Sequence, residues 1–210
     1  MMKNTRAIIV VTIIFFTPIF FWTIGTWQKI AMLKAEETKL EQTKRENIEV
    51  PRLEDLEPVF KKILPLASEF KRNKKEFSKD CLVSYLCFYK GKRIGVISLF
   101  TLEGQWGPMM LMMGVNMDGE ITHIELSYHT ETPGCGSQIE KRPFLDQFKG
   151  KTTQDPIEIY KDLLEATDAV KGVDCITRAT VSSRAIAKGV KEQLRLIVEN
   201  VIKGEEDVWR

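Results

Sequence analysis

The sequence has few of the residues that build a metal centre or a hydrolytic active site. It contains two histidines and four cysteines in 210 residues, and no two cysteines have the CxxC spacing. An iron–sulfur or zinc site built within this chain is therefore not expected. The Walker loop, the G-x-S-x-G elbow and the H-E-x-x-H motif are also missing, so the sequence offers no catalytic constellation for hydrolysis or group transfer.

An excess of charge of one sign is lacking too. The chain has 31 basic and 29 acidic residues, a net charge of +2, and the two signs are interleaved, so no nucleic-acid partner is expected. The composition, 43% hydrophobic and 29% charged, is that of a globular protein.

The four cysteines are dispersed along the chain. A disulfide between Cys81 and Cys87 would suit an extracytoplasmic domain. If both lie on one strand, however, six residues separate them by about 20 Å, which is beyond disulfide reach. We therefore predict no bridge between them.

A long uncharged run is present near the N-terminus. Residues 7–28 contain no charged side chain, and about twenty such residues cross a bilayer core as a helix. Trp22 and Trp27 near the end of the run are typical of a membrane interface. A cleaved signal peptide is the alternative, but the run is longer than a usual signal core and no A-x-A site follows it. Basic residues flank both ends, so charge does not decide the orientation.

The chain divides into four parts. We expect a transmembrane anchor at 1–28, a charged helical stalk at 29–52, a folded domain at 53–204 and a polar tail at 205–210. Within the domain, residues 53–75 show a helical pattern that is interrupted at Pro65 and includes Phe70 on its apolar face.

From Cys81 the pattern becomes that of strands. Turn signals at Lys90–Lys92 and at Asp118–Gly119 separate β-rich or alternating runs, which predicts an antiparallel sheet of about four strands. Short helices are expected at 143–148 and 156–169, and a buried C-terminal helix is expected from apolar residues spaced three or four apart between Ala185 and Val201. The predicted fold class is α+β, an antiparallel sheet packed with helices.

A Met-rich run, a histidine and a loop are candidates for a functional role. The Met-rich run 109–113 is interpreted as core filling rather than a soft cofactor pocket, and His123 as a half-buried or surface residue without chemistry. The loop 129–136, which contains one proline and two glycines, is either a plain connection or a backbone cradle for a polar or aromatic ligand.

The segment 174–183 carries four hydroxyl side chains at the start of the predicted C-terminal helix: Thr177, Thr180, Ser182 and Ser183. Such residues gather at helix starts to cap them. The same place favours a phosphate, because free backbone N–H groups and the helix dipole meet there. The residues alone leave both interpretations open.

Taken together, four blocks of sequence resemble a known family. They are Gly104-Gln-Trp-Gly-Pro-Met, Asp118-Gly-Glu-Ile, His129-Thr-Glu-Thr-Pro-Gly-Cys-Gly and Asp174-Cys-Ile-Thr-Arg-Ala-Thr-Val-Ser-Ser. In order and spacing they are similar to the FMN-binding domain found in the G component of the Rnf electron-transport complex, which is related to the C component of the sodium-pumping NADH:quinone oxidoreductase. The compact length is more similar to the Rnf component.

The resemblance implies FMN joined to Thr180 through a phosphothreonyl ester. It implies a flavin transferase that makes this bond from FAD outside the cytoplasmic membrane, so the N-terminus would be cytoplasmic and the domain extracytoplasmic. Partners would be the other subunits of an Rnf-type ferredoxin:NAD oxidoreductase and the lipid bilayer, and the chain would be a redox subunit of a translocase rather than an enzyme acting alone. The implied FMN-binding residues are Glu131, Thr132, Gly134, Cys135, Thr177, Arg178, Ala179 and Val181, and the helix start at Ser182 and Ser183 would meet the phosphate.

Two positions depart from the family pattern. Arg178 stands where the family has glycine, and Cys135 where it has leucine. Glycine in such a loop provides a positive φ or a close approach, whereas Arg178 offers charge to a phosphodiester. Two other functions therefore stay open: an assembly module with an empty FMN fold, and a flavoprotein that feeds a different extracytoplasmic acceptor.

Overall fold

The structure is a computed structural model that describes residues 32, 52–74, 77–134, 136–159 and 172–204. The chain forms two compact units, 1–49 and 50–210, and nearly all the described residues belong to the second. The predicted membrane anchor at 1–28, nearly all of the stalk and the tail at 205–210 lie outside the described residues. Among the helices that are described, none is both long enough and apolar enough to cross a bilayer.

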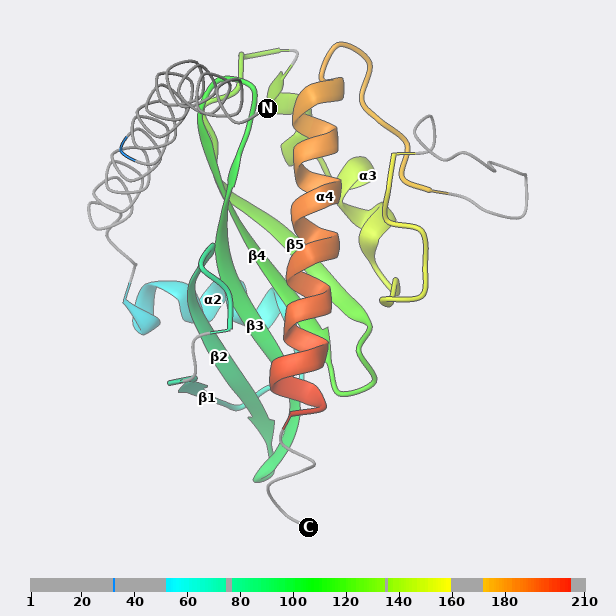
Figure 1. The fold of residues 1–210 in the computed structure, drawn as a ribbon. Coiled ribbons are helices and arrows are strands. Elements are labelled where there is room, and N and C mark those ends of the chain that lie inside the picture. The colour runs from blue at the N-terminus through cyan, green and yellow to red at the C-terminus, as the bar shows by residue number, and fades with distance from the viewer. Residues whose placement is uncertain (1–31, 33–51, 75–76, 135, 160–171, 205–210) are drawn as a thin grey trace, which may run out of the picture. The chain divides into compact units, whose positions relative to one another are not determined.

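A five-stranded antiparallel sheet forms the centre of the second unit, with the strands in sequence order (Figure 1). The strands are β1 (Glu69–Arg72), β2 (Cys81–Tyr89), β3 (Lys92–Glu103), β4 (Pro108–Asn116) and β5 (Ile121–Tyr128). The β2–β3 hairpin turns at Lys90 and Gly91, both with positive φ, which matches the right-handed twist of the strands. The predicted turns at Lys90–Lys92 and Asp118–Gly119 are confirmed.

The prediction of four strands is corrected to five, because part of the expected helix 53–75 is a strand. Helix α2 (Leu53–Ile63) ends before Pro65, and the chain then pairs with β2, where Phe70 lies opposite Cys87. The Phe70 ring packs against Phe60 of α2 with centroids 5.2 Å apart. Phe70 therefore joins the expected apolar cluster, but it reaches that cluster from the edge of the sheet.

Helices cover both faces of the sheet. Helix α2 lies on one face, and α4 (Thr180–Ile197) lies on the other with α3 (Arg142–Leu145), as Figure 1 shows. Alternation along β4 divides the Met-rich run between two cores: Met109, Leu111 and Met113 pack on the α4 side, and Met110 and Met112 on the α2 side. The interpretation of this run as core filling is confirmed.

The C-terminal elements follow the prediction more closely than the segment before them. Helix α3 and the 3-10 turn η2 (Asp146–Phe148) occupy the expected short helix. Helix α4 continues into one π-helical turn, η4 (Val198–Ile202), and buries Ile186, Val190, Leu194 and Ile197 completely. The helix expected at 156–169 does not begin at Pro156: residues 156–158 are not helical and Ile159 forms a parallel bridge with Val173. Residues 160–169 lie outside the described part.

Candidate functional site

The start of α4 carries no side-chain cap. Ala179 occupies the N-cap position with no side-chain hydrogen bond, and Thr180 is the first helical residue. The interpretation of the four hydroxyls as ordinary caps is therefore not supported. An uncapped start leaves N–H groups of the first turn directed away from the helix, where the helix dipole favours an anion.

A tight turn immediately precedes this helix start. The Ala179 N–H donates to the Ile176 carbonyl at 3.0 Å, which closes a turn with Thr177 and Arg178 at its centre. Arg178 has a φ of 69°, and a positive φ at the third residue of a turn is the type II arrangement that glycine favours. Thr177 and Arg178 are both exposed. The backbone at Arg178 thus has the conformation that glycine favours, which is the residue that the resemblance implies here, and arginine adopts it in this chain.

The two serines after Thr180 are engaged inside the protein. The buried Ser183 hydroxyl donates to the Ala179 carbonyl at 2.8 Å and accepts from the Ile176 N–H at 3.2 Å. The buried Ser182 hydroxyl donates to Glu131 Oε2 at 2.7 Å. Both hydroxyls are thus engaged within the protein, so the expectation that this helix start meets a phosphate rests on its backbone N–H groups. Thr180 is half-buried and Val181 is 50% exposed, so these two side chains remain at the surface.

The buried carboxylate of Glu131 joins three of the family-like blocks. Only 5% exposed, it accepts from the Gln105 N–H at 2.7 Å and from the Trp106 N–H at 3.5 Å through Oε1, and from Ser182 through Oε2. The turn between β3 and β4, the loop after β5 and the first turn of α4 therefore meet at one carboxylate. In Figure 1 the β3–β4 turn and the start of α4 lie at the same end of the domain.

The rest of the loop after β5 lies at the surface. Thr132 and Gly134 are exposed. Gly134 has a φ of 83° and open space where a Cβ would lie, and its N–H donates to the Ser137 hydroxyl at 3.1 Å. Cys135 lies outside the described residues. The Gly134 carbonyl also has a partner in this loop, Gln138 Nε2 at 2.8 Å, and the backbone cradle stays a prediction.

The sequence analysis gave no role to Trp106 and did not pair Glu131 with Ser182. Trp106 is 64% exposed, although its N–H is tied to Glu131, so its ring lies free at the edge of the site. The partnership of Glu131 with Ser182 spans 51 residues, and no local pattern could have paired them. The position of Trp106 in a turn between two glycines was a signal that its side chain would be exposed.

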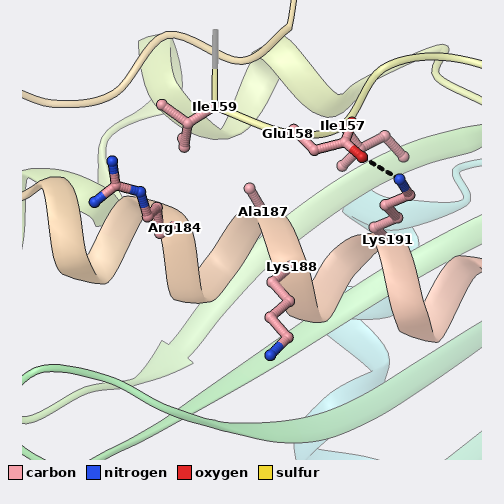
Figure 2. Close-up of a pocket in the computed structure, with 7 residues that line it drawn as sticks. All are labelled: Ile157, Glu158, Ile159, Arg184, Ala187, Lys188 and Lys191. Atoms are coloured by element: carbon pink, nitrogen blue, oxygen red, sulfur yellow. Dashed lines mark hydrogen bonds and ion pairs between the residues drawn. The ribbon is translucent and has the colours of Figure 1, made fainter. Parts of the chain in front are cut away.

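A separate cavity of about 300 Å³ lies between α4 and the segment 157–159. Figure 2 shows its lining: Ile157, Glu158, Ile159, Arg184, Ala187, Lys188 and Lys191. The lining is mainly apolar, and an ion pair between Glu158 and Lys191 lies at one side. None of the predicted site residues lines this cavity.

His123 and the cysteines of the sheet lie apart from the hydrogen bonds of the Glu131 carboxylate. His123 is half-buried, as predicted, beside Glu125 and Arg142. Cys81 and Cys87 lie on the same strand and form no disulfide with each other, so the prediction of no bridge between them is confirmed. Within the part of the chain that the structure describes, no group of three or more histidine, cysteine or acidic residues has metal-binding geometry.

Residues 104–195 match the family model of the FMN-binding domain. This stretch includes Glu131 with its hydrogen-bond partners, the turn at Arg178 and the start of α4. The resemblance to that domain is confirmed.

The relatives are components of ion-translocating complexes. The G component of the proton-translocating ferredoxin:NAD(+) oxidoreductase complex of Clostridium ljungdahlii is 34% identical over 95 residues, 45% of this chain and 49% of that protein. The G component of the Na(+)-translocating ferredoxin:NAD(+) oxidoreductase complex of Acetobacterium woodii is 28% identical over 156 residues, 73% of this chain and 72% of that protein. The chain thus spans about half the length of the first relative. A solved structure of the C component of the Na(+)-translocating NADH-quinone reductase from Parabacteroides distasonis has a TM-score of 0.48 at 21% identity, covering 73% of this chain and 85% of that one.

Proposed function

We propose that this chain is an electron-transfer subunit of an Rnf-type ion-translocating redox complex, and that it carries FMN through a phosphoester to Thr180. The observation that carries the proposal is the match to the FMN-binding domain over 104–195, together with an uncapped helix start at Thr180 inside that match. The chain would act within a complex, not as an enzyme alone.

The hydroxyls of the segment support Thr180 as the acceptor. Ser182 and Ser183 are buried and already hydrogen-bonded, whereas Thr180 is half-buried at the first position of α4. A phosphodiester at this position would meet the N–H groups of the first turn and the positive end of the helix dipole. The exposed Arg178 and Thr177 flank the same point, and Arg178 adds a positive charge near a phosphate.

The surface around Thr180 suits an aromatic ring. Trp106 and Val181 are large apolar side chains exposed by 64% and 50%, and each is next in sequence to a partner of Glu131, Gln105 or Ser182. Trp106 offers a face for offset stacking, and the main chain at Gly134 allows close approach because it has no Cβ. Thr132 adds an exposed hydroxyl on the same loop.

When bound, FMN would supply reversible uptake and release of electrons, and its potential would be set by the hydrogen bonds, charge and solvent exposure that the chain provides. Thr180 would give up its hydroxyl proton as its Oγ1 becomes bonded to phosphorus and AMP leaves from FAD. A tether through the phosphate leaves the ring unmodified and prevents loss of the cofactor by dissociation.

The same proposal extends to location and partners. Residues 1–28 would anchor the chain in the cytoplasmic membrane as a single span with the N-terminus inside. The FMN-binding domain would lie outside, where a flavin transferase matures it, and the other subunits of the complex would supply and receive its electrons. The names of the relatives, which place them in ferredoxin:NAD(+) oxidoreductase complexes, support this assignment.

The test is the absorption spectrum of the full chain purified from its own host. Visible flavin bands that survive denaturation and bleach with dithionite are expected. A colourless chain would contradict the proposal and favour an assembly module with an empty FMN fold, for which Arg178 is the motivating residue. Flavin in the chain without co-purifying Rnf-type subunits would favour a different acceptor.

A further inference from the structure

Glu131 uses its carboxylate inside the protein. The resemblance to the FMN-binding domain gives this residue a polar contact to the flavin, yet both oxygens already accept hydrogen bonds from the chain: Oε1 from Gln105 and Trp106, and Oε2 from Ser182. With 5% of the residue exposed, little of the side chain is left to meet a ligand. Its partners come from the β3–β4 turn and from α4, which are far apart in sequence.

Two glycines make room for this carboxylate. A Cβ on Gly104 would lie 2.3 Å from Glu131 Oε1, and a Cβ on Gly136 would lie 2.8 Å from Glu131 Cβ. Both distances are shorter than side chains tolerate, so any larger residue would displace the carboxylate. The Gly104–Gly107 turn and the loop that continues to Gly136 are therefore shaped around Glu131.

We infer that Glu131 is a positioning residue: it fixes the start of α4 against the Gly104–Gly107 turn and thereby sets where a group carried by Thr180 lies relative to Trp106. The effect of this role on a cofactor rests on the proposed function, because it requires a flavin attached to Thr180. Removing the carboxylate leaves the part-buried N–H of Gln105 and the buried Ser182 hydroxyl without the partner that they share, and a buried hydroxyl is costly to leave unpaired. The turn and the helix start would then separate.

Amide hydrogen exchange on the full chain in detergent tests whether Glu131 holds the Gly104–Gly107 turn against α4, and it does not require bound flavin. In Glu131→Ala, exchange should become at least about tenfold faster both at Gln105–Trp106 and at Ser183, whose N–H closes the first turn of α4 on the Ala179 carbonyl at 2.9 Å, because local opening no longer breaks a shared contact. Ser182→Ala removes only the hydrogen bond between Glu131 and α4. It should speed exchange at the same two places, and it replaces Glu131→Ala if that variant does not fold.

Two further variants separate positioning from general destabilisation. Glu131→Gln should restore near wild-type exchange, since its amide oxygen accepts from Gln105 and its NH₂ donates to the Ser182 oxygen. Gln193→Ala is the matched control: it removes a buried side-chain bond of the same helix, 2.8 Å to Ser78, and should leave Gln105–Trp106 unchanged. Unchanged exchange at Gln105–Trp106 in both Glu131→Ala and Ser182→Ala, or an equal acceleration in Gln193→Ala, would overturn the inference.

The visible circular dichroism of the flavin reads out the consequence. It should fall by at least about half in Glu131→Ala and Ser182→Ala and be retained in Glu131→Gln and Gln193→Ala, since induced dichroism follows the fixed geometry of the ring. Full dichroism in Glu131→Ala would contradict the positioning role. If the wild-type chain carries no flavin, the proposed function fails, while the exchange measurement still decides whether Glu131 ties the two segments.

Discussion

Arg178 occupies a backbone conformation that normally favours glycine. Its φ of 69° in a type II turn costs a side chain about 1–2 kcal/mol relative to glycine, partly offset by the greater freedom of glycine in the unfolded chain. We predict that Arg178→Gly raises the free energy of unfolding by about 0.5–1 kcal/mol, measured by urea denaturation of the full chain.

Lys90 is the matched control for this change. It also has a positive φ, 50°, in the exposed β2–β3 turn, so Lys90→Gly should stabilise the fold to a similar extent without affecting the proposed flavin site. Loss of stability in Arg178→Gly, with a gain in Lys90→Gly, would mean that the Arg178 side chain makes contacts that outweigh its backbone strain.

Cys87 is buried in the core between the sheet and α2, and its position gives a pH dependence. Burial raises the pKa of this thiol from its ordinary value of 9.0 to about 12. Because the folded state holds the proton more tightly, the stabilisation is complete below pH 9 and is lost as pH rises toward 12, by about 1.4 kcal/mol per pH unit. Urea unfolding of the full chain at neutral pH and at about pH 10 should show this loss.

The loss is judged by comparison with two variants. Cys87→Ala should have a shallower alkaline decline than wild type, because it has no buried thiol to ionise on unfolding. Val83→Ala, which truncates a buried side chain of the same strand that does not titrate, should keep the wild-type slope. Equal slopes in all three chains would show that Cys87 does not titrate in this way.

At the scale of elements, α2 approaches the sheet closely at Gly114 of β4. A Cβ there would lie 2.2 Å from Ile63 Cγ2 and 2.6 Å from Thr122 Oγ1. We predict that Gly114→Ala lowers the free energy of unfolding by about 1–3 kcal/mol through overpacking. In a double-mutant cycle, Ile63→Ala should relieve part of this cost, so the two effects are not additive. Strict additivity would show that Ile63 is not what the new methyl group meets.

The sequence predicts elements well where periodicity and turn chemistry agree. The β4–β5 hairpin at Asp118–Gly119 and the buried face of α4 follow directly from local pattern. Strand β1 could not be predicted in this way, because its four residues continue an apolar spacing that fits a helix, and only pairing with β2 decides between the two.

The site likewise contains features that the local sequence predicts and features that only tertiary contacts decide. Thr180 and the turn at Arg178 are found from adjacent residues, and the family resemblance gives them a role. The hydrogen bond from Ser182 to Glu131 joins residues 51 apart, so only the tertiary fold shows that these side chains face inward. No local pattern shows that the hydroxyls of Ser182 and Ser183 are engaged inside the protein.

At the scale of the whole molecule, the proposed topology predicts where the two ends of the chain lie. Alkaline phosphatase fused after Arg210 of the full chain should be active in cells, because it folds only outside the cytoplasm, whereas a green fluorescent protein fused there and exported by the same route should stay dark. A fluorescent, phosphatase-inactive pair would place the FMN-binding domain in the cytoplasm and contradict the proposed location.

The central claim is that Thr180 alone carries the flavin. The direct measurement is peptide mapping by tandem mass spectrometry of the full chain and of three variants, Thr180→Ala, Thr177→Val and Ser183→Ala, each made with the flavin transferase of the host. The account predicts a mass increment of one FMN less one water on Thr180 in wild type, Thr177→Val and Ser183→Ala, and no increment in Thr180→Ala. An increment that persists in Thr180→Ala, or that maps to Thr177 or Ser183 in the wild-type chain, would contradict it.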